Sequence, residues 1–158
     1  MSDTYYVKTF GGLEITNDNV TVNIVELFGK QLVNLLQVLL FHSEKPVQKD
    51  ELIDILWPES KNPSSALKFS IFRLRAELNE IEFFKDKEVI VTTRKGYILN
   101  PNLDWNIDFV ELEKAYNQIN DGSELLDEKE FKTARKIFRL YQGRFYASPS
   151  QLHWILQK

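Results

Sequence analysis

The chain has 158 residues, of which 43% are apolar and none is cysteine; one hydrophobic core with a smaller helical annex is expected, and disulfides are excluded. The longest apolar run, residues 35–41, is too short to cross a bilayer and no secretion signal is recognisable, so a cytoplasmic protein without membrane segments is expected. The formal charge of −3 disfavours indiscriminate nucleic-acid binding, yet residues 61–75 carry four cations and no acid.

Three short β-rich segments come first along the chain. Residues 5–10, 13–15 and 20–25 are separated by a Gly11-Gly12 turn and an Asn17-Asp18-Asn19 turn. This pattern predicts a small antiparallel sheet. The glycine pair is interpreted as a turn and not as a phosphate-binding loop, because no helix follows a strand there at the required spacing.

The hydrophobic period then changes to that of helices. Leucines from Leu32 to Leu40 predict a largely buried helix that begins near Lys30 and ends before Pro46, and residues 49–56 predict a second, closed by Trp57-Pro58. A third helix is expected over Pro63–Leu78, with Pro63 as a favoured first residue. On it Leu67, Ile71, Leu74 and Leu78 share the core-facing side, and the opposite face carries Ser65, Phe69, Phe72, Arg73 and Ala76, flanked by Lys68 and Arg75.

A hairpin and a helical tail complete the chain. Residues 88–93 and 97–99 are β-rich runs on either side of the basic tip Arg94-Lys95-Gly96, which predicts a hairpin. After Pro101-Asn102, Asp108 with Glu111 fits an N-cap and its partner for a helix to about residue 119. Further helices are expected over residues 124–141, with Phe131, Ala134, Ile137, Phe138 and Tyr141 buried, and after Pro149.

Five motifs in this order resemble a known family. Residues 51–58 (ELIDILWP) resemble the second-helix signature of OmpR/PhoB-type winged helices in SARP-like bacterial regulators, residues 67–75 (LKFSIFRLR) their recognition helix, and residues 93–97 (TRKGY) their wing. Beyond Pro101, Asp108-Phe109, residues 140–145 (LYQGRF) and Trp154 are similar to the start of the bacterial transcriptional activation domain, a TPR-like module.

The resemblance implies an α+β architecture in two parts. Residues 1–100 would form the winged-helix DNA-binding domain, with its N-terminal sheet, three helices and wing at 88–99. Residues 101–158 would form an all-α, TPR-like extension for self-association or for contact with another protein of the transcription machinery. Because a TPR-like unit buries its faces only against neighbours and the sequence ends after about three tail helices, we expect a homodimer or a fragment of something longer.

Specific side chains are expected to contact duplex DNA. Arg73 is best placed for guanine in the major groove, and Lys68 and Arg75 suit phosphates. Ser64, Ser65 and the free amides at the helix start suit another phosphate. Arg94 and Lys95 would follow the adjacent minor groove or its backbone.

Phe69 and Phe72 leave three interpretations open, because at residue 72 the family more often has a polar or basic side chain. The two rings could contact thymine methyl groups. One ring could instead fold back onto the wing or the second helix as additional core. Alternatively, the pair forms a protein interface on a degenerate winged helix that has lost DNA binding. The wing also departs from the common pattern, since it has one glycine in place of two.

Enzymatic and metal-dependent functions are not expected. His42 and His153 have no neighbouring acidic or cysteine ligands, and no nucleophile triad, buried carboxylate pair or nucleotide loop is present. No cofactor is predicted. The leading hypothesis is a sequence-specific bacterial transcription regulator, and its rival is a protein-interaction module that docks a partner through Phe69 and Phe72.

Overall fold

The computed structural model describes residues 4–9, 12–108 and 110–111. The tail helices predicted over residues 112–158 therefore lie outside the described residues, as do His153 and Trp154. Among the described helices, none is long and apolar enough to cross a membrane.

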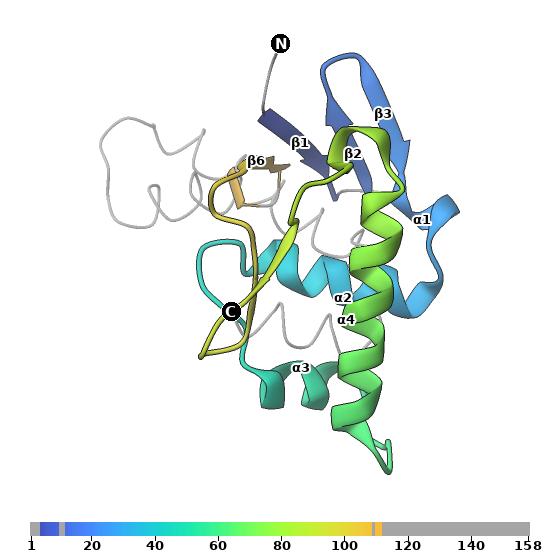
Figure 1. The fold of residues 1–158 in the computed structure, drawn as a ribbon, viewed down its shortest axis with the longest axis vertical. Helices are drawn as coiled ribbons and strands as arrows, with labels where there is room; N and C mark the ends of the chain where they lie inside the picture. The colour runs from blue at the N-terminus through green and yellow to red at the C-terminus, as the bar shows by residue number, and fades with distance from the viewer. Residues whose placement is uncertain (1–3, 10–11, 109, 112–158) are drawn as a thin grey trace, which may run out of the picture.

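A four-stranded sheet forms one end of the molecule (Figure 1). Its strands are β1 (Thr4–Lys8), β2 (Glu14–Asn17), β3 (Val20–Asn23) and β6 (Asp104–Ile107), in the order β3-β2-β1-β6. The first three pair antiparallel, as predicted. β6 pairs parallel to β1, with Val7 opposite Ile107, so the sheet is mixed where a purely antiparallel one was expected.

The third predicted strand is shorter than expected. It ends at Asn23, and Ile24–Leu27 form the short helix α1, whose first turn is capped by the Asn23 side chain through a 3.3 Å bond from the Glu26 amide. Asn is a favoured N-cap because its side-chain oxygen accepts from the free amides of the first turn.

Three longer helices follow at the predicted positions. They are α2 (Lys30–Phe41), α3 (Lys49–Leu56) and α4 (Pro63–Asn79). α2 is buried from Leu32 to Phe41 and contacts both α3 and α4. A 3-10 turn, η1 (Glu82–Phe84), ends the helical part and places Phe84 in the core against Tyr5, with ring centroids 4.8 Å apart.

The predicted hairpin is present as β4 (Ile90–Thr92) and β5 (Tyr97–Leu99). Val47, in the connection between α2 and α3, adds a bridge to Tyr97, with mutual backbone bonds of 2.8 and 3.0 Å. The hairpin lies alongside α4, and its tip and the start of α4 both lie at the end of the molecule opposite the four-stranded sheet (Figure 1). The architecture is the predicted winged helix.

Asp108 joins the end of the described chain to its beginning. Its two carboxylate oxygens accept bonds of 3.0 Å from the Thr9 amide, and one accepts a 2.6 Å bond from the Thr9 hydroxyl. Thr9 is fully buried. The residue predicted as a helix N-cap thus closes the β1–β6 end of the sheet.

Candidate nucleic-acid interface

The two faces of α4 differ sharply in exposure. Leu67, Ile71, Leu74 and Leu78 are at most 2% exposed and fix the helix to the core, as the helical period predicts. The other face is open over about three and a half turns and holds most of the predicted site: Ser64, Ser65, Lys68, Phe69, Phe72, Arg73 and Ala76 are all exposed. A helix held by one side in this way can enter a groove with the other.

The first turn of α4 offers free backbone donors. Pro63 occupies the first helical position, and Asn62 makes no side-chain cap bond. The amides of Ser64 and Ser65 therefore belong to the set that a helix leaves unpaired at its start. Both serine side chains are exposed beside them, which fits the predicted phosphate contact.

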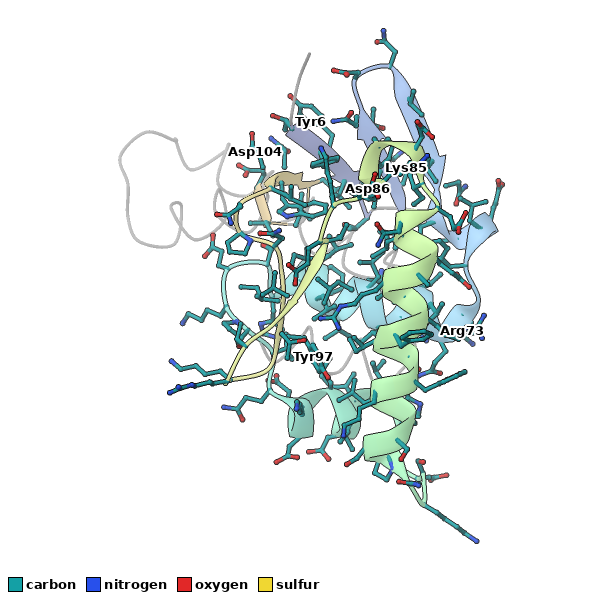
Figure 2. The ribbon with its side chains drawn as sticks, viewed as in Figure 1. Tyr6, Arg73, Lys85, Asp86, Tyr97 and Asp104 are labelled. Atoms are coloured by element: carbon teal, nitrogen blue, oxygen red, sulfur yellow. The ribbon has the colours of Figure 1, made fainter. Side chains whose placement is uncertain are left out.

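Arg73 is held in place by its neighbours on the same helix. Its Nη2 donates a 3.2 Å bond to Oε1 of Glu77, and its guanidinium carbon lies 6.0 Å from the centre of the Phe69 ring. The side chain remains 54% exposed. Figure 2 shows Arg73 on the outer side of α4, whereas Tyr97, in strand β5 of the hairpin, lies on the other side of the helix. Arg73 is thus pre-oriented and accessible.

The interpretation that one phenylalanine folds back into the core is wrong. Phe69 is 62% exposed and Phe72 is 71% exposed, and both are among the most exposed large apolar side chains of the described residues. Leu67 and Ile71 already fill the core side of this segment, so the helical period leaves the two rings facing outward. The interpretations as a DNA contact or a protein contact remain.

Arg75 points elsewhere than expected. Its Nε and Nη2 donate bonds of 3.3 and 3.1 Å to the Ile90 carbonyl, and Nη2 also donates a 2.7 Å bond to the Thr92 hydroxyl. The planar fork of arginine makes such a multiple bond possible. Arg75 therefore ties α4 to the first strand of the hairpin.

The tip of the hairpin is a tight turn. The Thr93 amide donates a 2.7 Å bond to the Gly96 carbonyl, and the Thr93 hydroxyl accepts from the amides of Lys95 and Gly96 at 3.2 and 3.1 Å. Arg94 and Lys95 between them are exposed. The single glycine is placed where it is required, because Gly96 has φ +146° and a Cβ there would lie 1.9 Å from the Val47 carbonyl oxygen.

Several contributors to this surface were not predicted. Glu77 lies four residues after Arg73, a spacing at which opposite charges pair on a helix, so the sequence contained the signal. Thr92 and Val47 carried none, because their contacts with Arg75 and Tyr97 depend on how distant segments pack.

The described residues contain no cluster of three metal-ligating side chains. The one described histidine, His42, has its Nε2 3.8 Å from Oε1 of Glu51, a structural contact beside the core. The outer face of α4 and the tip of the hairpin instead offer cations, aromatic rings and backbone donors, which suit a polyanion with accessible bases.

Comparisons with known proteins found one matching family model and similar solved structures. Residues 23–99 match the family model described as "Transcriptional regulatory protein, C terminal". Two solved structures are similar. The DNA-binding domain of E. coli CadC is 26% identical, with a TM-score of 0.44, over 59% of this chain and 89% of that chain. Mycobacterium tuberculosis EmbR in complex with a low-affinity phosphopeptide is 20% identical, with a TM-score of 0.50, over 90% of this chain and 36% of that chain.

The likeness to EmbR concerns the fold alone, and this chain spans about a third of EmbR. No curated protein matches the chain. The family match covers α1 to β5, which includes the whole of α4 and the hairpin.

Proposed function

Because residues 23–99 are a winged helix of the OmpR/PhoB-type transcriptional regulatory family, a family of regulators and not of enzymes, we propose that the chain binds duplex DNA sequence-specifically. In this proposal α4 enters the major groove and the hairpin β4–β5 is the wing. The observation that supports it best is the open face of α4, which presents Arg73 and Lys68 opposite a fully buried leucine and isoleucine stripe.

Each exposed side chain has a separate role in this proposal. Arg73 donates two bonds to guanine O6 and N7, and Phe69 and Phe72 contact thymine methyl groups. Lys68, together with Ser64, Ser65 and their amides, binds phosphates. Arg94 and Lys95 at the wing tip follow the neighbouring minor groove or its backbone.

Few phosphate contacts are available to one chain, so affinity for a single site is modest. Binding of two chains to repeated half-sites raises it, because the second contact becomes intramolecular. The part of residues 101–158 that follows β6, where the sequence predicts helices, is proposed to mediate this self-association or a contact with another protein of the transcription machinery.

The test is selection of binding sites from a random duplex library, followed by affinity measurements on the selected site. Arg73→Ala is expected to weaken binding by about 10- to 100-fold, the discrimination of one bidentate base contact, and to relax selection at one position. Lys85→Ala, an exposed cation close to the sheet and far from Arg73 (Figure 2), serves as the control and should bind normally. Failure to select any consensus would sink the proposal.

The exposed phenylalanine pair also supports a second candidate, a protein-docking surface. Phe72→Ala distinguishes the two, because its side chain is 71% exposed and its removal leaves the core intact. If the change lowers DNA affinity alone, the ring contacts DNA. If it abolishes partner capture or self-association and neither form retains DNA, the docking candidate replaces DNA binding.

A further inference from the structure

A groove lies between the edge of the sheet and the end of α4, away from the start of the helix. Its volume is about 410 Å³, and it is lined by apolar side chains of β3, α1 and η1 together with Glu77, Glu80 and Glu82. We call it the acidic groove. Two of its apolar side chains are strongly exposed, Leu27 at 61% and Val20 at 54%.

The acidic groove combines two features that together define its occupant. Covering Val20, Leu27 and their apolar neighbours is favourable, because it removes apolar surface from water. The lining also carries three glutamates and no cation, and one of them, Glu77, is paired with Arg73 outside the groove. Only a segment that is both apolar and basic matches the apolar side chains and the carboxylates together. An acidic segment would be repelled by the carboxylates, and a purely apolar segment would bury them without a partner.

Outside α4 and the loop before it, the chain contains one such segment. Residues 131–145 (FKTARKIFRLYQGRF) carry five cations and no acidic residue. They lie outside the described residues, but the sequence predicts a helix over residues 124–141. On a helix Phe131, Ala134, Phe138 and Tyr141 share one face, and Lys132, Arg135 and Arg139 lie along its edge.

The connection is long enough. Roughly 19 residues separate Glu111 from Phe131, which span about 28 Å even if wholly helical. β6, where the described chain ends, and β3, which lines the groove, are at opposite edges of the same sheet. Three strand spacings separate them, about 14 Å.

We propose that residues 131–145 dock in the acidic groove of their own chain. The apolar face of the segment covers Leu27 and Val20, and its basic edge faces Glu80 and Glu82. This inference does not depend on DNA binding. It gives the helical tail a definite attachment to the winged helix, on the side of α4 that leaves the N-terminal turns open.

The absence of cysteine from the whole chain permits a direct test. Leu27→Cys is combined with Ala134→Cys in the full-length protein, and disulfide formation under mild oxidation is followed by mass and by non-reducing gel. A cross-link within one chain is expected, forming at least tenfold faster than in the control pair Lys95→Cys with Ala134→Cys. Lys95 is exposed at the wing tip, beyond reach of the acidic groove in this arrangement.

The charge requirement is tested in the same background. Glu80→Lys with Glu82→Lys should slow the cross-link several-fold, and Asp50→Lys with Asp54→Lys, two exposed acids on α3, should not. Circular dichroism establishes that each variant is folded. Equal rates for the two cysteine pairs, or no cross-link in either, would overturn the proposal. So would cross-links found only between two chains, which would identify a second copy as the occupant.

Discussion

Lys68 and Arg75 lie about two helical turns apart on α4, and they show that position on a helix does not determine the role of a side chain. Both lie on the flank of the exposed face, and both were expected to bind phosphates. Lys68 is exposed, but Arg75 donates hydrogen bonds from Nε and Nη2 to the Ile90 carbonyl and from Nη2 to the Thr92 hydroxyl. We propose that Arg75 positions the wing and that Lys68 contacts DNA.

The salt dependence of binding separates these roles. The slope of log K against log salt concentration is negative, and each lost phosphate contact makes it less steep by about 0.9. Lys68→Ala should therefore reduce the slope by about this amount. Arg75→Ala should weaken binding with the slope unchanged and lower the free energy of unfolding by about 1 kcal/mol, since it removes hydrogen bonds between α4 and β4. Affinities measured from low to high salt decide, and equal slope losses would make Arg75 a phosphate ligand.

At the scale of elements, each strand of the wing is held by a contact with another part of the fold. Arg75 holds β4 to α4, and Val47 holds β5 through its bridge to Tyr97. The bridge brings Val47 against Gly96, so close that no side chain fits between them. The wing can therefore be altered at Arg94 and Lys95, which are exposed, but not at the glycine beside them.

Gly96→Ala is expected to lower the free energy of unfolding by about 2 kcal/mol or more, because its Cβ overlaps the Val47 carbonyl and φ +146° is strained for alanine. Chemical denaturation measures the change. Gly29→Ala is the matched control: a Cβ there meets nothing within 4 Å, and its effect should stay within about 0.5 kcal/mol. A stable Gly96→Ala protein would show that the bridge can open without cost.

At the scale of the whole molecule, residues after the wing complete the sheet at the chain's beginning. β6 covers the edge of β1, and Asp108 accepts both hydrogen bonds that the buried Thr9 donates. The sheet that begins at β1 thus includes residues 104–107, which lie beyond the end of the family match at residue 99.

Asp108→Ala is expected to lower the free energy of unfolding by about 1–3 kcal/mol, because it leaves the buried Thr9 donors without these acceptors. Thermal or urea unfolding gives the value. Asp104→Ala, which loses one exposed bond from the Thr4 hydroxyl, should cost less than about 1 kcal/mol. In combination with Thr9→Val the effects should be non-additive, since the two side chains share their bonds; strict additivity would argue against the contact.

Helices and turns that depend on neighbouring residues could be predicted from the sequence, and pairings between distant segments could not. The three long helices and the hairpin follow from hydrophobic period, Pro63 and the Gly96 turn. The bounds of the helices agree closely with the structure, whereas β4 is shorter than the predicted run of residues 88–93. The sequence predicts the end of a strand where α1 begins, because Ile24 and Val25 are β-branched, although Asn23 is also a favoured N-cap. β6 has four residues and pairs with a strand about a hundred residues away, a relation that no local pattern contains.

The same limit applies to the candidate interface. Which side chains share the outer face of α4 could be predicted from the 3.6-residue period, and the exposure of Phe69 and Phe72 follows from it. The direction taken by Arg75 could not, because either the solvent or the Ile90 carbonyl satisfies an arginine on a helix flank, and the choice depends on where the hairpin packs.

The pairing of Arg73 with Glu77 gives the proposed DNA contact an internal competitor. The carboxylate takes up one of the five N–H donors of Arg73, and guanine can engage two of the others with its two aligned acceptors, while other base edges do not. The carboxylate also repels nearby phosphates, so it weakens every non-specific encounter equally. Non-specific sites vastly outnumber specific sites on a genome. Such a regulator would spend less time bound at non-specific sites, and its affinity for the specific site would be lower than it could be without the carboxylate.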